Sequence, residues 1–111
     1  MADATTTIED LKLTVRRFVG ERHWEPFHSP KNLAMALAVE AAELMEPFLW
    51  LDLDESRRLP ADPAKRSALA DEIADVAYVL LNLCQSLDID LSEAFAAKMA
   101  KNTVKYPPPG G

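Results

Sequence analysis

Residues 33–46 read LAMALAVEAAELME and residues 72–83 read EIADVAYVLLNL, and these two stretches decide the fold. Both are rich in strong helix formers, and their apolar side chains recur at intervals of three and four. Neither stretch contains a glycine or a proline, so nothing interrupts the backbone hydrogen bonds of a helix. The sequence therefore predicts two helices with apolar faces and an all-α fold.

Capping signals set the limits of these two helices. Ser-Pro at residues 29–30 and Asp-Pro at residues 62–63 each place a capping side chain before a proline, which the first helical position tolerates. Pro47 should bend or end the earlier helix, because its ring clashes with the carbonyl four residues back. The later helix is expected to run to about Asp88.

Two shorter helices are expected at the ends of the chain. Thr6 and Glu9 suggest a capping box for a helix that runs to about Arg22, and a similar box at Asp90 starts a last helix that ends near Asn102. The helix that starts after residue 63 carries a 3/4-spaced seam suited to a bundle. Its members are Leu69, Ile73, Val76, Leu80, Leu83 and Leu87.

We therefore predict a four-helix-type bundle formed by a single domain over residues 1–107, with residues 108–111 as a flexible tail. Residues 51–62, LDLDESRRLPAD, are expected to form an exposed polar connection and a candidate flap. A bundle of this size is thin, so we expect it to assemble as a dimer or tetramer.

Charge and cysteine usage exclude several classes of protein. The chain of 111 residues has a net charge of −6, which argues against a nucleic acid polymer as partner because no basic stripe is present. No apolar run approaches the roughly 18 residues needed to span a membrane. The single cysteine, Cys84, has no partner for an internal disulfide, so a cytoplasmic location is expected.

Two acid pairs carry the chemistry. Glu40 and Glu43 are three residues apart on one predicted helix, and Glu72 and Asp75 repeat the spacing on the other, so each pair projects from nearly one face. Both pairs border apolar stripes, where four carboxylates repel one another unless a cation or protons intervene. Oxygen ligands favour Mg²⁺, with Mn²⁺ as a substitute.

The acids are also open to other interpretations. Zinc is disfavoured because no Cys or His pair has helical spacing, and a di-iron centre would want a Glu-x-x-His motif, which the candidate helices lack. Acid pairs are also common on solvated helix faces. The alternative hypothesis is therefore a non-catalytic helical module that binds nucleotides or a protein and uses its acids only for solubility.

The ordered motifs resemble a known family. The ExxE of residues 40–43 and the ExxD of residues 72–75 are similar to the signature of the MazG-like all-α NTP pyrophosphatases. The segments ERHWEPFHSPKNL at residues 21–33 and KMAKNTVKYP at residues 98–107, with Phe48 and Trp50 between them, resemble its dCTP pyrophosphatase branch. The likeness covers nearly the whole chain.

This resemblance implies hydrolysis of a deoxynucleoside triphosphate, with dCTP or a modified dCTP as the leading candidate, to the monophosphate and pyrophosphate. It implies that the four acids hold Mg²⁺, which neutralises the phosphates and activates a water. Such an enzyme removes unwanted nucleotides from the cellular pool. Glu43 is the first candidate for the general base, although the motif does not separate a ligand from a base.

The resemblance also implies a set of substrate-binding residues. In that branch the matching aromatic residues lie beside the base and the matching C-terminal segment closes the nucleotide site. The implied residues are Trp24, His28, Trp50, Lys98, Asn102, Lys105 and Tyr106. Without the resemblance, the tryptophans would be read as packing residues and the lysines as solvated charges near a helix C-terminus.

The sequence departs from the family pattern at specific positions. Family members often have a tyrosine four residues after the last acid, where this chain has Val79, and Tyr78 is expected to point about 100° away from that position. Related deoxycytidine enzymes can have a histidine where this chain has Val15. These departures bear on the choice of base.

Overall fold

In the computed structural model, which describes residues 1–110, helices account for all regular structure. The described part of the chain contains no strand, so the all-α prediction is confirmed. The α-helices are α1 (Ile8–Glu21), α2 (Pro30–Met45), α3 (Leu53–Arg58), α4 (Pro63–Ser86) and α5 (Leu91–Lys105). Short 3-10 helices are η1 (Asp3–Thr5), η2 (Glu25–Phe27), η3 (Glu46–Phe48) and η4 (Leu59–Ala61).

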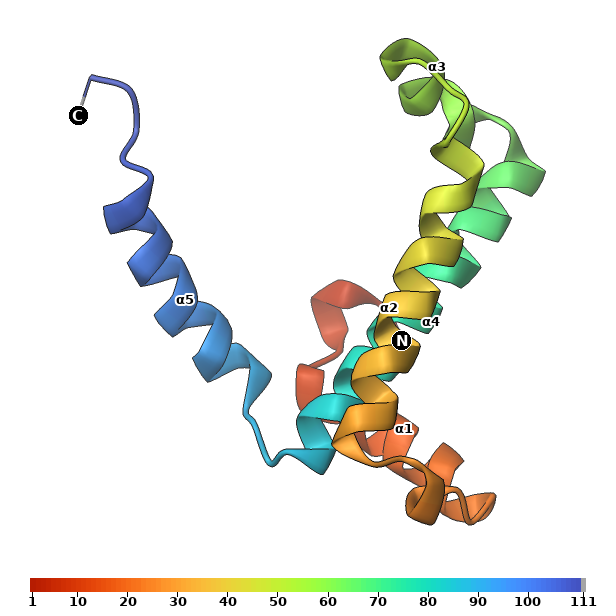
Figure 1. Ribbon diagram of the computed structural model, residues 1–111, viewed down its shortest axis with the longest axis vertical. Coiled ribbons are helices and arrows are strands. Elements are labelled where there is room, and N and C mark those ends of the chain that lie inside the picture. Colours follow the sequence, from red (N-terminus) through yellow and green to blue (C-terminus); the bar gives the residue numbers. More distant parts are fainter. Residues whose placement is uncertain (111) are drawn as a thin grey trace.

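The centre of the fold is the antiparallel pair of α2 and α4, which lie side by side along most of their length (Figure 1). Helix α1 packs against the second half of α4. Buried apolar side chains from these three helices form the core, and they are Val15, Val19, Leu33, Leu69, Val79, Leu81 and Cys84. The two stretches that predict the fold are therefore the two helices that build its centre.

Capping side chains begin the helices much as the sequence predicts, with one shift in register. Ser29 accepts a hydrogen bond from the Asn32 amide, and Asp62 caps α4, as expected. At α1 the cap is Thr7 rather than Thr6, and its box partner is Asp10 rather than Glu9. The Asp10 carboxylate accepts a hydrogen bond from the Thr7 amide at 2.9 Å. The shorter aspartate side chain thus takes the place of the glutamate that is usual in a capping box.

Residues 51–62 form a largely exposed connection, as predicted, but most of this connection is helical. Asp52 and Glu55 form a reciprocal capping box that starts α3, and η4 follows directly. The box was hidden in a segment that carries charge and no apolar stripe. Pro47 behaves as predicted, since α2 ends at Met45 and continues only as η3.

Helix α5 stands away from the other helices, so the chain does not close a four-helix bundle by itself (Figure 1). It contains no buried residue and runs to Lys105, beyond the predicted end at Asn102. Because no fourth helix covers the predicted seam of α4, Ile73 and Leu87 remain 56% and 47% exposed. Of the predicted tail, Gly111 lies outside the described residues.

A polar latch fixes the junction between α4 and α5. The Lys12 ammonium donates a hydrogen bond to the Ile89 carbonyl at 3.0 Å, and the Gln85 amide donates to the Lys12 carbonyl at 2.8 Å. Asp88 in this junction has a φ of 52°, in the left-handed region that ends many helices. Helix α1 therefore holds the point from which α5 leaves the core.

None of the helices formed by residues 1–110 combines the length and the apolar character that crossing a bilayer requires.

Candidate metal centre

Three of the four predicted acids meet across the α2–α4 contact. One carboxylate oxygen each from Glu40, Glu43 and Glu72 lies within 4.8 Å of the other two. Glu40 follows the core residue Leu33 by seven positions, or two helical turns, so its side chain faces α4. Antiparallel packing then places Glu72 opposite it. The sequence prediction that the two pairs come together is met by these three residues.

The cluster leaves two buried oxygens without a partner. Glu40 Oε2 and Glu72 Oε2 are inaccessible to solvent and take part in no hydrogen bond within the described chain. Burial raises the pKa of Glu40, and the charges of Glu43, Asp75 and Glu72 raise it further. Burial also raises the pKa of Glu72, with Glu43 and Asp75 the largest electrostatic contributors. Negative charge is therefore concentrated at a cluster in which two carboxylate oxygens are out of reach of water.

This arrangement suits a divalent cation. A buried carboxylate oxygen without a hydrogen bond is costly, and a bound cation supplies the missing partner while cancelling the repulsion between neighbours. The donor set is oxygen only, which favours hard ions over zinc. Glu43 is exposed, so the solvent side of the cluster is open to a ligand.

Asp75 lies beside this cluster rather than in it. Three residues on an α-helix turn through about 300°, so a row spaced by three drifts about 60° around the helix at each step. The row formed by Glu72, Asp75 and Tyr78 therefore leaves the side of α4 that faces α2 and reaches α1. There Asp75 lines a pocket of about 290 Å³ whose other walls are Thr14, Val15, Phe18 and Tyr78.

Aromatic side chains gather at this pocket. The rings of Phe18 and Tyr78 meet edge to face at 5.7 Å, and the rings of Phe18 and Trp24 do so at 5.6 Å. The Arg22 guanidinium stacks over Phe18 at 3.8 Å from the ring centre. Trp24, predicted to lie beside a base, thus belongs to the aromatic group that borders the pocket of Asp75.

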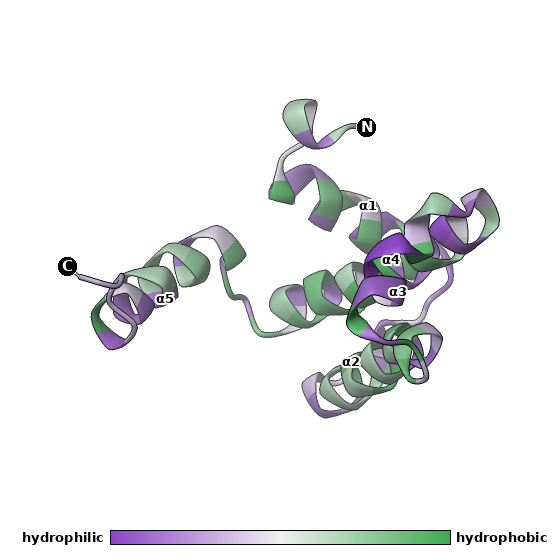
Figure 2. Ribbon diagram, turned by 90° about the horizontal axis from the view of Figure 1, so that it is seen from above, coloured by the Kyte–Doolittle hydropathy of each residue, from purple (hydrophilic) through white to green (hydrophobic). Residues whose placement is uncertain are grey.

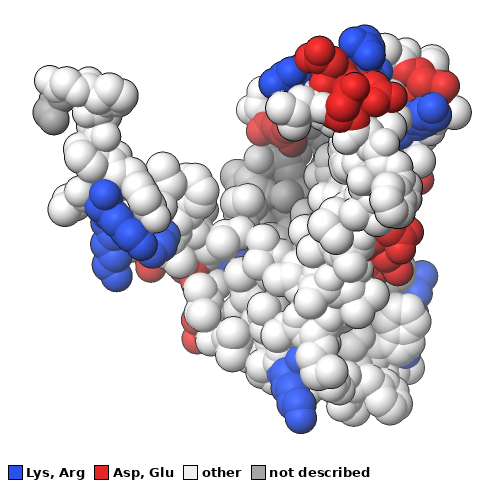
Figure 3. All heavy atoms as spheres, turned by 45° about the horizontal axis from the view of Figure 1, so that its top comes forward, with Lys and Arg blue, Asp and Glu red and all other residues white. Residues whose placement is uncertain are grey.

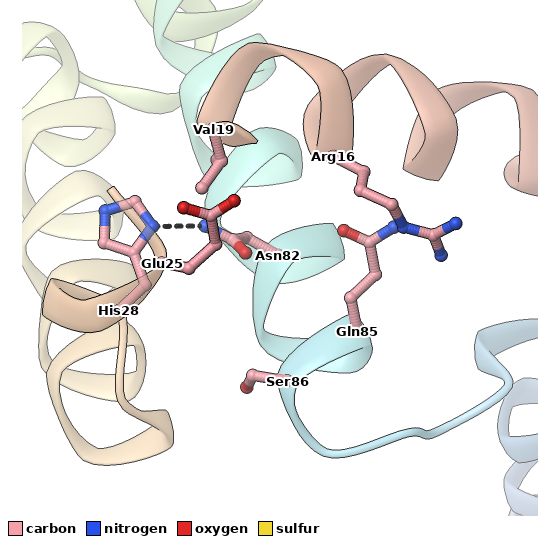
Figure 4. Close-up of a pocket in the computed structure, with 7 residues that line it drawn as sticks. All are labelled: Arg16, Val19, Glu25, His28, Asn82, Gln85 and Ser86. Atoms are coloured by element: carbon pink, nitrogen blue, oxygen red, sulfur yellow. Dashed lines mark hydrogen bonds between the residues drawn. The ribbon is translucent and has the colours of Figure 1, made fainter. Parts of the chain in front are cut away.

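His28 faces a different pocket. Its Nδ1 lies 2.9 Å from the buried Asn82 amide, and Figure 4 shows this pair opposite Arg16 and Gln85 across a cavity of about 240 Å³. Its ring also approaches Trp24 edge to face, with 6.1 Å between centres. None of the four acids lines this cavity, so the structure separates His28 from the cluster.

The remaining predicted substrate residues do not reach the acids within one chain. Trp50 is 94% exposed on the connection after η3. Helix α5 carries the predicted Lys98, Asn102 and Lys105, and it lies across an open space from α2 and α4 (Figures 1 and 3). Tyr106 ends that helix and is 67% exposed. Their roles remain predictions.

The aromatic wall of the pocket was not among the predicted site residues. Phe18 is one apolar residue of a short amphipathic helix, and Tyr78 stands one position before the tyrosine of the family pattern. The available signal was the continuation of the three-residue row from Glu72 through Asp75 to Tyr78. Contact between that row and α1 depends on tertiary packing, which the row alone does not reveal.

Comparison with known proteins supports the family resemblance that the sequence motifs indicate. The MazG-like family model matches residues 35–111, a range that includes both acid pairs. This chain belongs to the MazG-like family. The MazG-like chain is 37% identical to a pyrophosphatase from Archaeoglobus fulgidus DSM 4304, with a TM-score of 0.85, and the match covers 97% of this chain and 99% of the other.

Curated relatives of this MazG-like chain include mammalian enzymes. It is 39% identical over 101 residues to dCTP pyrophosphatase 1 from Mus musculus and, over the same length, to dCTP pyrophosphatase 1 from Homo sapiens. Each match covers 91% of this chain but 59% of the relative. The chain therefore spans about three fifths of the length of these relatives.

Proposed function

We propose that this chain is a Mg²⁺-dependent pyrophosphohydrolase that cleaves a deoxynucleoside triphosphate to the monophosphate and pyrophosphate. The observation that carries the proposal is the cluster of Glu40, Glu43 and Glu72, with its two buried and unpaired oxygens. The names of the relatives, dCTP pyrophosphatase 1 and pyrophosphatase, support the same reaction class. The leading substrate is dCTP or a modified dCTP, and the role is removal of unwanted nucleotides in the cytoplasm.

The four acids divide the work according to their surroundings. Glu40 and Glu72 would hold the cation from the buried side, where each has a carboxylate oxygen without a hydrogen-bond partner. Asp75 would approach the cation from the side of the aromatic pocket that it lines. When bound, Mg²⁺ would neutralise phosphate charge and lower the pKa of a water, and Mn²⁺ can substitute for it. Glu43, the exposed member, is placed to accept the proton of the attacking water.

We further propose that the working form is a dimer or tetramer. The chain exposes 8585 Å², whereas a compact protein of 12.3 kDa would expose about 6,100 Å². Its radius of gyration is 16.9 Å, against roughly 13 Å expected for a compact domain of this length. The excess surface, about 2,500 Å², is the size of an obligate interface.

Helix α5 supplies the surface that a partner would cover. Phe95, Met99 and Tyr106 fall within about 40° of one another around the helix, and each is exposed. Lys98 and Lys105 border this stripe, so an α5 that packs on a second copy would carry two positive charges towards its acids. Hydrophobic residues recur along α5 between hydrophilic ones (Figure 2). We propose that Lys98, Asn102, Lys105 and Tyr106 complete the site of a neighbouring subunit.

Product analysis tests the reaction. The purified chain is incubated with Mg²⁺ and each member of a panel of dNTPs and NTPs, and the products are separated and identified. We expect monophosphate and pyrophosphate in equal amounts, with dCTP the best substrate. Release of orthophosphate without pyrophosphate would overturn the choice of bond. A Glu40→Gln and an Asp75→Asn variant that keep full function would favour the non-catalytic module.

Complementation tests whether the site is shared between subunits. Glu40→Gln and Lys98→Ala chains with different tags are produced together, and assemblies that hold both tags are isolated. Each variant alone should be nearly inactive. If Lys98 serves the neighbour's acids, mixed assemblies recover activity, because some sites then have an intact acid cluster and an intact lysine. Mixed assemblies as inactive as either parent would place both residues in the same subunit's site.

A further inference from the structure

The junction between α4 and α5 sets the direction in which α5 points. Helix α5 contains no buried residue, so packing along its length does not hold it. Because a helix rises about 1.5 Å per residue, Lys105 lies about 21 Å from the start of the helix at Leu91. A tilt of about 10° at that start would displace Lys105 by about 4 Å. The residues that α5 carries can therefore reach a defined point only if its first turn is fixed.

A Schellman motif closes the end of α4. Asp88 has a φ of 52°, and its amide donates a hydrogen bond to the Gln85 carbonyl at 3.2 Å. The Ile89 amide donates to the Cys84 carbonyl at 2.9 Å. This pair of hydrogen bonds around a left-handed residue is the pattern that reverses the chain at many helix ends. Ile89 is thereby held at a fixed point beyond the last turn of α4.

Lys12 satisfies the other backbone group of Ile89. Its ammonium donates a hydrogen bond to the Ile89 carbonyl at 3.0 Å, and only 9% of Lys12 is exposed. Among the ion pairs formed by residues 1–110, none involves Lys12. A buried ammonium without a carboxylate partner is costly, although the C-terminal end of α4 favours a positive charge nearby. This cost is borne at the carbonyl that leads directly into α5.

The first residues of α5 are anchored as well. The Asp90 carboxylate caps the helix by accepting a hydrogen bond from the Glu93 amide at 2.8 Å. Leu91 packs against the buried core cluster that α1 and α4 share. Together with the two hydrogen bonds of Ile89, these contacts fix the position and the direction of the first turn of α5.

Resting on the proposed function, in which α5 completes a neighbouring site, we propose that Lys12 is a positioning residue for that neighbour. By holding the Ile89 carbonyl, Lys12 presets the direction of α5, so that Lys98 and Lys105 reach the acids of the second subunit already oriented. Groups that are oriented in advance avoid the entropy cost of ordering during the reaction. Lys12 lies outside the acid cluster and outside the pocket that Asp75 lines, so it acts through α5.

Distances between two spin labels test the preset direction. The labels are attached to Lys65→Cys on α4 and Lys101→Cys on α5, which are exposed positions, whereas the native Cys84 is buried. Each chain also carries Phe95→Glu, because a charge in the apolar stripe keeps a neighbour from holding α5. The distance distribution should be narrow with Lys12 and broad after Lys12→Met, which keeps the length of the side chain but cannot donate. Equal widths, whether narrow or broad, would overturn the inference.

Turnover by mixed assemblies separates an effect on α5 from an effect on α1. Alone, Lys12→Met should lower kcat/KM for dCTP about tenfold, because the productive direction of α5 is less populated. Lys31→Met is the matched control and should match the wild type, since Lys31 is exposed on α2.

Assemblies that combine Lys12→Met with Glu40→Gln chains should recover activity. The intact acids of the Lys12→Met chain then meet an α5 that the other chain's Lys12 still holds. Absence of recovery would place the fault in the site of the Lys12→Met chain itself and would overturn the inference.

The two measurements distinguish failure of this inference from failure of the proposed function. If the wild type hydrolyses no triphosphate but Lys12→Met broadens the distance distribution, the preset direction of α5 stands and the proposed reaction falls. If the wild type is active but the two distributions are equal, the reaction stands and the role of Lys12 is refuted.

Discussion

At the residue scale, the acid cluster places catalysis and stability in opposition. Glu40 and Glu72 each bury an oxygen that no hydrogen bond satisfies, and each has a raised pKa. A sequence optimised only for packing would not retain two carboxylates against the α2–α4 contact. Their presence is understandable if a bound cation is part of the working state.

Glu40→Gln should therefore separate the two properties. Without Mg²⁺ the variant should unfold at a higher temperature than the wild type, because it removes a buried charge that its neighbours repel. With Mg²⁺ its turnover of dCTP should fall by on the order of 10²- to 10³-fold. Thermal unfolding in EDTA and the product assay measure the two effects.

Asp71→Asn is the matched control for this variant. Asp71 precedes Glu72 on α4 but is exposed and lies outside the cluster. The Asp71→Asn variant should therefore turn over dCTP as fast as the wild type. A Glu40→Gln chain that melts below the wild type in EDTA would show that the carboxylate is not under electrostatic strain.

The raised pKa values also predict how stability depends on pH. A carboxyl group whose folded pKa exceeds its ordinary value of 4.5 contributes stability that is fully present below that value. This contribution is lost as the pH rises through the raised pKa. In metal-free protein, the wild type should therefore lose stability relative to a Glu40→Gln, Glu72→Gln double variant as the pH rises from about 4 to 8.

Urea unfolding at several pH values measures this difference directly. Mg²⁺ added at the upper end of the range should restore the stability of the wild type and leave the double variant unchanged, because a ligand stabilises only the chain that binds it. A constant difference between the two chains across the range would contradict the prediction.

At the element scale, short capping motifs fix the ends of helices, which are exposed and make few packing contacts. The Asp62 carboxylate accepts hydrogen bonds from the amides of Ala64 and Lys65, at 2.9 and 3.3 Å. Helix α4 carries Glu72 and Asp75, so its first turn supports the site as well as the fold. Asp62→Ala should lower the free energy of unfolding by about 1 kcal/mol.

Asp54→Ala provides the comparison for Asp62→Ala. Asp54 makes an exposed ion pair with Arg57 at 2.9 Å, and such pairs contribute little to stability. Its loss should therefore change the free energy of unfolding by less than about 0.5 kcal/mol. Chemical denaturation of both variants gives the two values. Equal losses of unfolding free energy would contradict the stabilising role of the Asp62 cap.

The same motifs explain what the sequence could and could not predict. Ser29, Asp62 and the two prolines that follow them act through neighbouring residues, so α2 and α4 begin where expected. The acid cluster could also be predicted from the sequence, because Glu40 and Glu72 border apolar stripes that face the core. The direction of α5 and the pocket walls depend on packing between distant segments, and no local pattern encodes them.

At the scale of the whole molecule, the apolar stripe of α5 is exposed in a single chain, and a second subunit that covers it would account for it. Phe95 and Met99 are 66% and 46% exposed on one face of the helix. Phe95→Glu should convert the assembly to monomers and lower activity with it, because a charge buried in an apolar interface is costly. Light scattering at micromolar concentration measures the mass.

Val104→Glu is the control on the same helix. Val104 is 84% exposed and lies about 180° around α5 from Phe95, so its substitution should leave the mass unchanged. A wild-type chain that is monomeric in this measurement, and active as such, would exclude the proposed assembly.

The latch at the start of α5 links parts of the molecule that seem to have separate tasks. Lys12 holds the Ile89 carbonyl, while Val15 and Phe18, one and two turns further along α1, line the pocket beside Asp75. The position of α1 therefore bears both on this pocket and on the start of α5. A substitution that shifts α1 is therefore expected to alter both the pocket beside Asp75 and the direction of α5.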